Sequence, residues 1–456
     1  MISAYDLQTA GAELVAGPEA AVFSKIVIDS RQAQGGALFV ALPGERTDGH
    51  RYLKDAVAKG AKGVLVSRLP QEDLGEAAVY LTDDCLKTLG NLARIHRRRL
   101  DPVVVGITGS CGKTTTKDFL ASILRQGAEV LATFGNYNNE LGLPLTLLSL
   151  ERQHKYAVLE MGMRGLGQID YLCSIAEPQL GIVTNIGVTH LELLGSQEKI
   201  AQAKGELVES LPAHGVAVLN WDDPFARQLA KKNRGRTVYF GFHPEADLWA
   251  EPKGLNEAVF HYGPESIEVR LPIWGRHNIA NSLAAAAAAM ALGCSLQQAA
   301  EGIANAQISD LRLRLEEGRG GWQILNDTYN AAPASTMAAL EVLAQLGRTH
   351  GRRTVAALAD MLELGEKAPQ FHRQVGEKAA ELAIGRLVTV GELGREIAQG
   401  ALGAGMPADK IASFSTTAEA SEYLLATLAA DELVLLKGSR SMAMDKVAEA
   451  LRGGEE

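Results

Sequence analysis

The chain has 456 residues, of which 46% are hydrophobic and 22% charged, and its formal net charge is −9. A single hydrophobic core stops growing at roughly 250–300 residues, so this length predicts two or three domains, and the composition excludes an intrinsically disordered chain. The acidic balance disfavours a broad nucleic-acid or anionic-membrane surface, but it allows a local basic pocket for an acidic substrate.

The cysteines and the apolar runs indicate a cytoplasmic protein. The four cysteines are widely scattered, without the paired spacing of a zinc site or a disulfide framework. The first residues include Asp6 and Glu13 and no lysine or arginine before Lys25, unlike a secretory signal. The longest apolar run, residues 283–292, is about half as long as a membrane span.

Residues 1–85 are predicted to form a small α/β domain. Their short apolar runs are typical of strands, and residues 52–59 have helical patterning. A following helix is expected to end before Asp101, because Pro102 disfavours helical geometry in its predecessor. We interpret the arginine run at residues 97–99 as a solvated helix end and not as a binding patch.

Residues 86–310 are predicted to form the central domain. Apolar strands alternate there with helical segments, a pattern typical of a mostly parallel sheet wrapped by helices. The predicted strands are residues 103–107, 156–159, 181–184, 216–219 and 238–240. The domain closes with residues 278–292, whose six consecutive alanines favour a helix.

In residues 311–456, apolar strands again alternate with helical segments, and this pattern predicts a third domain. Its expected strands are residues 322–325, 354–358, 387–390 and 433–436. The predicted fold class is therefore α/β with three domains. These are a small N-terminal substrate domain, a central P-loop-type parallel sheet with helices, and a C-terminal Rossmann-like domain.

Residues 108–115 are the most informative segment, because they lie between a predicted buried strand and a predicted helix. Backbone N–H groups and the dipole at a helix N-terminus attract phosphate, and Lys113 can reach the β- and γ-phosphates while the Thr114 hydroxyl ligates Mg²⁺. The general P-loop places a glycine where this chain has Ile107, which points to a subclass. The predicted ATP-binding residues are Thr108, Gly109, Ser110, Cys111, Gly112, Lys113, Thr114 and Thr115.

Three further polar residues are candidates for the same edge of the sheet. Glu160 ends a predicted strand and offers the oxygen ligands that Mg²⁺ prefers. His190 follows another strand, in a loop expected at the same edge. Taken alone, residues of either kind are more often structural than functional, and Lys204 by itself is typical of a solvated helix face.

Four motifs, in this order, resemble the ATP-dependent Mur ligases, which build the peptide stem of bacterial peptidoglycan. They are residues 108–115, Glu160-Met161-Gly162, Thr184-Asn185-Ile186-Gly187 with His190, and His277-Asn278-Ile279-Ala280-Asn281. The shortened phosphate loop is similar to this family's own variant. Residues 135–146, 326–333 and 436–444 look like the branch of the family that adds D-alanyl-D-alanine.

The resemblance implies a role for each motif residue. The catalytic residues would be Lys113, Lys204, Glu160 and His190. Two Mg²⁺ ions would be held by Thr114, Glu160, His190 and Lys204, with Lys204 carbamylated so that it carries a carboxylate-like group. Beyond the phosphate loop, ATP would contact Asn278, Asn281, Arg312, Asp327, Tyr329 and Asn330. The substrate residues would be Ser30, Arg31 and Asp48 at a nucleotide-sugar site, with Asn138, Asn139, Thr184, Asn185, Lys437, Ser439 and Arg440 elsewhere.

The resemblance also implies a reaction. The γ-phosphoryl group of ATP would pass to the carboxylate of UDP-N-acetylmuramoyl-tripeptide, and the amine of D-alanyl-D-alanine would attack the acyl phosphate. The products would be UDP-N-acetylmuramoyl-pentapeptide, ADP and phosphate. Both substrates are small molecules, and the implied enzyme is a monomer that needs neither nucleic acid nor membrane insertion.

Three other functions share the phosphate loop. A sister Mur ligase or a folylpolyglutamate-type ligase would use the same central residues with another amine. A small-molecule kinase would release a stable phosphorylated product. A P-loop NTPase switch would hydrolyse ATP slowly and exchange partners, although three α/β domains fit substrate sequestration better.

Overall fold

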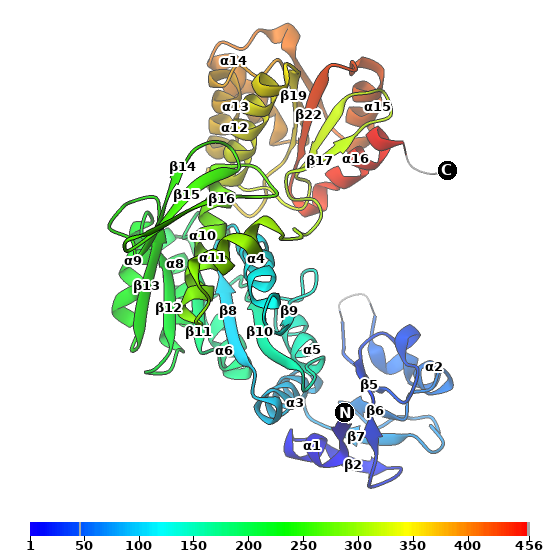
Figure 1. Ribbon diagram of the computed structural model, residues 1–456. Coiled ribbons are helices and arrows are strands. Elements are labelled where there is room, and N and C mark those ends of the chain that lie inside the picture. The colour runs from blue at the N-terminus through cyan, green and yellow to red at the C-terminus, as the bar shows by residue number, and fades with distance from the viewer. Residues whose placement is uncertain (45–46, 454–456) are drawn as a thin grey trace.

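The computed structural model describes residues 1–44 and 47–453. They form three α/β domains, each built on its own sheet, and this confirms the predicted fold class (Figure 1). The N-terminal domain lies beside the central domain and away from the C-terminal one. None of the helices in the described ranges combines the length and apolar character needed to span a bilayer.

The N-terminal domain is a five-stranded sheet with an apolar cluster on each face. The sheet order is β2 (Glu13–Ala16), β7 (Ala78–Leu81), β6 (Gly63–Val66), β5 (Leu38–Val40) and β4 (Ile26–Val27). Only β2 is antiparallel to its neighbour. The remaining elements are β1 (Ile2–Ser3), α1 (Ala4–Thr9), β3 (Val22–Phe23), η1 (Ser30–Gln32), η2 (Gly49–Tyr52) and α2 (Leu53–Ala58).

Helix α3 (Cys85–Leu100) joins the first two domains and ends at Asp101, as the Asp-Pro pair predicts. Its Leu89 packs in the N-terminal core, whereas Ala93 packs in the central one. The interpretation of the arginine run at residues 97–99 as a solvated helix end is wrong for Arg97. This side chain is buried, and its Nε donates to the carbonyl of Ala176 at 2.9 Å, because it closes the C-terminal end of another helix.

The central domain is a nine-stranded sheet covered by helices on both faces. The order is β16 (Glu265–Arg270), β15 (Glu257–Tyr262), β14 (Leu248–Pro252), β13 (Arg236–Gly241), β12 (Val216–Asn220), β11 (Leu180–Val183), β8 (Val103–Thr108), β10 (His154–Glu160) and β9 (Glu129–Ala132). The strands from β9 to β14 are parallel, and β15 and β16 add an antiparallel edge.

The helices of the central domain divide between the two faces of the sheet. One face is covered by α4 (Lys113–Arg125), α10 (Arg276–Ala291) and α11 (Leu296–Ala304). The other face carries α5 (Gly142–Leu148), α6 (Gln168–Ala176), α8 (Gln197–Glu209) and α9 (Pro224–Gln228). The short α7 (Leu191–Leu194) and η3 (Leu229–Lys232) complete the domain. The six consecutive alanines of α10, residues 284–289, are all buried, so their small side chains serve packing.

The C-terminal domain is a six-stranded sheet. Its order is β17 (Arg314–Glu317), β18 (Gln323–Asn326), β22 (Glu432–Lys437), β19 (Arg353–Ala359), β20 (Arg386–Val390) and β21 (Ile411–Phe414), with only β17 antiparallel. Helices α12 (Pro333–His350), α13 (Ala368–Glu381) and α14 (Gly394–Gly403) cover one face. Helices α15 (Thr417–Thr427) and α16 (Met444–Arg452) cover the other, and η4 (Gly365–Lys367), η5 (Ala408–Lys410) and η6 (Arg440–Met442) lie in connections.

The central and C-terminal domains are in direct contact. Val188, Leu255 and Trp274 of the central domain pack against the apolar core of the C-terminal one. We propose domain boundaries at 1–85, 86–310 and 311–456. The first boundary falls at the beginning of α3, which packs against the domains on either side.

Candidate active site

The phosphate loop connects the end of β8 to the beginning of α4, and its two glycines are required by close contacts. Gly112 has a φ of 85°, and a Cβ there would lie 2.1 Å from Asn281 Oδ1. A Cβ on Gly109 would lie 1.9 Å from Thr184 Oγ1. No side chain caps the N-terminus of α4, so its first backbone N–H groups are available to a phosphate.

The end of β11 holds this loop in place. Ser110 N–H donates to the carbonyl of Asn185 at 3.0 Å, and Cys111 N–H donates to the Asn185 side-chain oxygen at 3.0 Å. Thr184 Oγ1 donates to the carbonyl of Cys111 at 2.6 Å. The strand ends at Val183, earlier than predicted, and this frees the two side chains to reach the loop. Thr184 and Asn185 therefore support the phosphate loop from the neighbouring strand.

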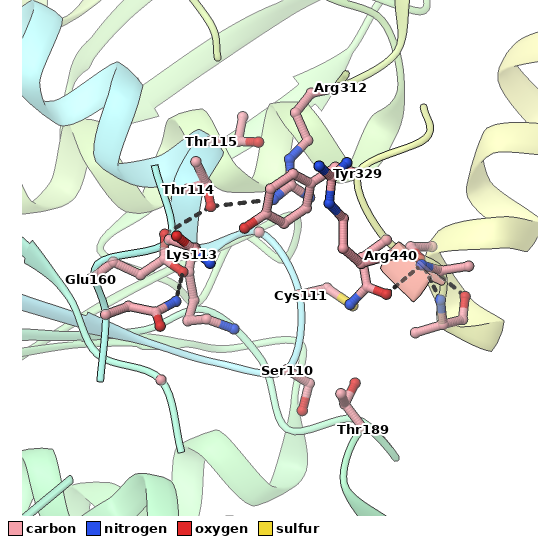
Figure 2. A pocket seen from close by; sticks show the side chains of 18 of the residues that line it. Ser110, Cys111, Lys113, Thr114, Thr115, Glu160, Thr189, Arg312, Tyr329 and Arg440 are labelled. Carbon is pink, nitrogen blue, oxygen red and sulfur yellow. Dashed lines mark hydrogen bonds between the residues drawn. The ribbon is translucent and has the colours of Figure 1, made fainter. Parts of the chain in front are cut away.

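Thr114 connects the loop to both walls of the site. Its hydroxyl donates to Glu160 Oε2 at 2.7 Å and accepts from Arg312 Nη2 at 3.3 Å (Figure 2). The other oxygen of Glu160 accepts from Asn138 Nδ2 at 2.8 Å. Glu160 is 3% exposed at the end of β10, so its carboxylate is fixed from two sides. Arg312 is thus the C-terminal domain's contact with the phosphate loop.

Three of the basic side chains that line the same cavity come from the central domain's phosphate loop, from α8 and from the loop before α7. Lys113 Nζ donates to the carbonyl of Gly109 at 2.8 Å. Lys204, on α8, is 2% exposed, and burial, followed by the charge of Lys113, lowers the pKa of its amine well below the usual value. His190 has a φ of 66°, and burial lowers the pKa of its imidazole although Glu363 opposes this. Burial therefore disfavours the charged form of both side chains.

The C-terminal wall contains a buried ion pair. Lys437 Nζ lies 2.5 Å from Asp327 Oδ2 and donates to the carbonyl of Asn330 at 2.8 Å. The guanidinium of Arg312 lies 3.9 Å from the centre of the Tyr329 ring, and Figure 2 shows the two side chains together. Lys437 is therefore bonded within its own domain, where it orients the segment that carries Tyr329 and Asn330.

The cavity between the two domains has a volume of about 530 Å³. The predicted residues that line it are Ser110, Cys111, Gly112, Lys113, Thr114, Thr115, Asn138, Asn139, Glu160, His190, Lys204, Asn278, Asn281, Arg312, Asp327, Tyr329, Asn330, Lys437 and Arg440. Six further lining residues belong to motifs found in the sequence but were given no individual role: Asn136, Glu140, Gly162, His277, Ala331 and Ala332. The lining residues that sequence reasoning missed are Met163, Arg164, Gln168, Thr189, Leu313 and Ser335. Several of these stand directly beside a motif residue, and this proximity was the available signal.

The remaining predicted residues lie outside this cavity. Thr108 and Gly109 form the base of the loop, and Ser439 is buried, where its hydroxyl accepts a hydrogen bond from Leu362 N–H at 2.9 Å. In the N-terminal domain, Ser30 Oγ donates to Asp55 and the exposed Arg31 pairs with Asp29. Asp48 contacts both His50 and Arg68. The structure thus places Ser30, Arg31 and Asp48 in a separate domain from the phosphate loop (Figure 1).

A smaller, mostly apolar cavity of about 160 Å³ adjoins the loop. Its apolar walls come from Phe240, Ala280, Pro333 and Ala338, and polar groups are supplied by Asn185, Asn220 and His277 among others. Burial lowers the pKa of His277 to about 4, so its imidazole is neutral near pH 7. An apolar slot with a few polar groups is suited to a nucleobase. Asn278 and Asn330, two of the predicted ATP contacts, line the larger cavity.

The cavity contains some of the oxygen ligands that an Mg²⁺ ion needs, but not a full set. The Thr114 hydroxyl and the Glu160 carboxylate are the oxygen donors that Mg²⁺ prefers, and they are already in contact. Across residues 1–44 and 47–453, acidic, imidazole and thiol side chains do not gather in threes to form a metal site. An unmodified Lys204 amine adds a poor ligand, whereas a carbamate would add oxygens to the set.

Comparisons with known proteins agree with this geometry. The sequence patterns of the Mur ligase family catalytic domain, the Mur ligase middle domain and the Mur ligase glutamate ligase domain match residues 22–94, 107–289 and 311–440. The UDP-N-acetylmuramoyl-tripeptide--D-alanyl-D-alanine ligase of Bacillus subtilis is 35% identical, with 95% of this chain and 94% of the relative covered.

Two solved structures extend the likeness to the fold. The MurF crystal structure from Acinetobacter baumannii has a TM-score of 0.89 at 34% identity, covering 99% of this chain and 98% of that one. The MurF ligase of Thermotoga maritima in complex with ADP has a TM-score of 0.81 at 28% identity, covering 94% and 97%. The chain belongs to the Mur ligase family.

Proposed function

We propose that the protein is an ATP-dependent ligase that joins D-alanyl-D-alanine to the carboxylate of UDP-N-acetylmuramoyl-tripeptide. The observation that carries this proposal is the contact of Arg312, from the C-terminal domain, with Thr114 on the phosphate loop. It places groups from two domains around one cavity, in a chain whose full-length relatives bear this activity. An enclosed site between domains suits a reactive intermediate that water must not reach.

The chemistry follows from the poor reactivity of an ionised carboxylate toward an amine. Transfer of the γ-phosphoryl group to the tripeptide carboxylate forms an acyl phosphate and releases ADP. The neutral amine of the dipeptide then attacks the acyl carbon, the C–O bond to phosphate breaks, and the nitrogen loses a proton. Lys113, Arg312 and the N-terminus of α4 stabilise the transferring charge, so catalysis is mostly positioning and electrostatics.

The proposal includes Mg²⁺ and a carbamate on Lys204. Mg²⁺ would neutralise phosphate charge, held by Thr114 and Glu160 with His190 and modified Lys204 at the same cavity. A lysine whose pKa is lowered by burial presents a neutral amine, which adds to CO₂ and releases one proton to give a carbamate. We also propose that the enzyme acts as a monomer, since one chain supplies both walls of the cavity. We propose that it acts in the cytoplasm.

The carbamate can be detected without an activity measurement. Incubation with ¹³C-bicarbonate is expected to produce one carbamate resonance in the carbon NMR spectrum of the parent protein and none in Lys204→Ala. Lys199→Ala, an exposed position on the same helix, is the control and is expected to keep the resonance. An active parent enzyme without this resonance would contradict the modification.

The activity is tested by product identity. The purified protein is incubated with ATP, Mg²⁺, UDP-N-acetylmuramoyl-tripeptide and D-alanyl-D-alanine, and the mixture is analysed by liquid chromatography with mass spectrometry. We expect a pentapeptide amide with one ADP and one phosphate per amide, and no amide when any substrate is omitted. A stable phosphorylated product without amine would identify a kinase. Amide formation only with another amino acid would identify a sister ligase, and slow ATP hydrolysis alone would identify a switch.

A further inference from the structure

A loop of the C-terminal domain reaches across the cavity edge to the central domain. Glu363 Oε2 lies 2.6 Å from His190 Nδ1, and Glu363 Oε1 lies 3.8 Å from Arg164 Nη2. The backbone takes part as well, because Glu192 N–H donates to the carbonyl of Glu363 at 3.4 Å. One carboxylate therefore lies between two basic side chains that belong to the facing domain, both of which line the cavity.

The backbone at this contact is unusual on both sides. His190 has a φ of 66° and Glu363 a φ of 62°, and neither is a glycine. Within residues 1–44 and 47–453, eight non-glycine residues have a positive φ, and two of them touch each other here. Non-glycine residues in the left-handed region persist only where the surroundings hold them, and such residues concentrate at functional sites. This pairing is unlike an ordinary exposed ion pair.

The loop that carries Glu363 is braced by its own domain. Met361 N–H donates to His372 Nε2 at 2.9 Å, and Leu362 N–H donates to Ser439 Oγ at 2.9 Å. Ser439 N–H in turn donates to the carbonyl of Asp360 at 3.1 Å. His372 and Ser439 are both buried, so two fixed side chains of the C-terminal domain hold the loop that presents Glu363 to the central domain.

On the central side, the loop fits closely against α7. A Cβ added to Gly365, which has a φ of 61°, would lie 3.2 Å from the Cα of Glu192. His190 Nδ1 is buried and lies 2.6 Å from Glu363 Oε2, but the contact does not have the geometry of a hydrogen bond, so it is a close electrostatic contact. A carboxylate this close to one nitrogen of a histidine restricts the orientation of the ring.

We propose that Glu363 is a positioning residue that clasps the C-terminal domain onto the central domain and sets the His190 imidazole for the reaction. The inference rests on the proposed function, and it adds a residue that none of the sequence motifs supplied. The clasp joins residues of two domains, so it couples the position of the C-terminal domain to the arrangement of groups at the cavity. Arg164 contributes a second, weaker contact to the same carboxylate.

The test compares Glu363→Ala and Glu363→Gln with Glu366→Ala, an exposed glutamate in the adjoining turn. With both substrates saturating, we expect kcat to fall about 10- to 100-fold in the Glu363 variants, as for other partners that orient a functional histidine. The KM for ATP should change less than about 2-fold, because the phosphate loop is untouched. Glu363→Asp should recover part of kcat, whereas Glu366→Ala should match the parent.

A second readout does not depend on turnover. Small-angle X-ray scattering with ADP and UDP-N-acetylmuramoyl-tripeptide is expected to show a smaller radius of gyration for the parent and Glu366→Ala than for Glu363→Ala. Circular dichroism checks that each variant is folded. In a His190→Ala background, Glu363→Ala should add little further loss of compaction, because the two residues act as a pair.

The possible results distinguish a failure of the proposed Glu363 clasp from a failure of the proposed ligase activity. If the Glu363 variants keep the kcat and the compaction of Glu366→Ala, the clasp is overturned. If the parent makes no amide but compacts in a Glu363-dependent manner, the proposed function fails while the clasp stands as an interdomain contact. Equal and additive effects of Glu363→Ala in the parent and His190→Ala backgrounds would overturn the pairing with His190.

Discussion

Replacing Lys113 with alanine is expected to lower kcat by at least about 100-fold, as for the loss of one group that stabilises transition-state charge. Lys113 is the first residue of α4 and lines the interdomain cavity beside the phosphate loop. Its ammonium group can follow the γ-phosphoryl group as negative charge moves from ATP to the acyl phosphate. The reaction barrier should therefore rise more than the free energy of ATP binding weakens.

The measurement is the rate of ADP release that depends on both substrates. The control is Lys199→Ala, which removes an exposed lysine from α8 in the same domain and should leave turnover unchanged. A near-normal kcat for Lys113→Ala would contradict the proposed role of this residue. A rise in KM with kcat preserved would restrict Lys113 to binding.

Replacing Lys437 with methionine is expected to destabilise the C-terminal domain by about 3–5 kcal/mol, because it leaves a buried carboxylate without its partner. Lys437 is 2% exposed at the end of β22, and Asp327 is 7% exposed beside β18. Their contact links two central strands of the sheet. Loss of the lysine also frees the carbonyl of Asn330, so the segment next to the cavity should become less ordered.

Differential scanning calorimetry can resolve the transition of the C-terminal domain. The double variant Lys437→Met with Asp327→Asn should recover part of the loss, because it removes the unpaired charge as well. Arg353→Ala breaks an exposed ion pair with Asp431 in the same domain and should change the transition little. A shift for Lys437→Met no larger than that for Arg353→Ala would show that the buried pair contributes nothing to stability.

Sequence patterns predicted the elements with strong periodicity. The apolar runs of β8, β10, β11 and β22 are buried on both faces of parallel sheets, so nearly every residue is apolar and the signal is continuous. The strands β14 to β16 at one edge of the central sheet are absent from the prediction. In β16 only Val269 is buried, and such half-exposed edge strands have too few apolar positions to stand out.

The residues of the candidate site were also predictable only in part. The phosphate loop was predictable because strand, glycines, lysine and threonine are contiguous, and Glu160 and His190 follow strands of the same sheet. The smaller cavity was not predictable in full, since Phe240 and Asn220 carry no motif and are brought to the loop only by the order of the strands. Glu363 was missed because an isolated acid in a loop has no local signal.

The sequence by itself determined which groups can bind phosphate and activate a carboxylate, because those groups are specified by residue type and short spacing. Only the tertiary structure decided how the two walls of the cavity meet. Arg312 and Thr114 are 198 positions apart, and Lys437 and Asp327 are 110 apart. Contacts of this kind depend on domain packing and strand order, so Lys437 proved to be an internal partner of Asp327, and Glu363 proved to be the contact to His190.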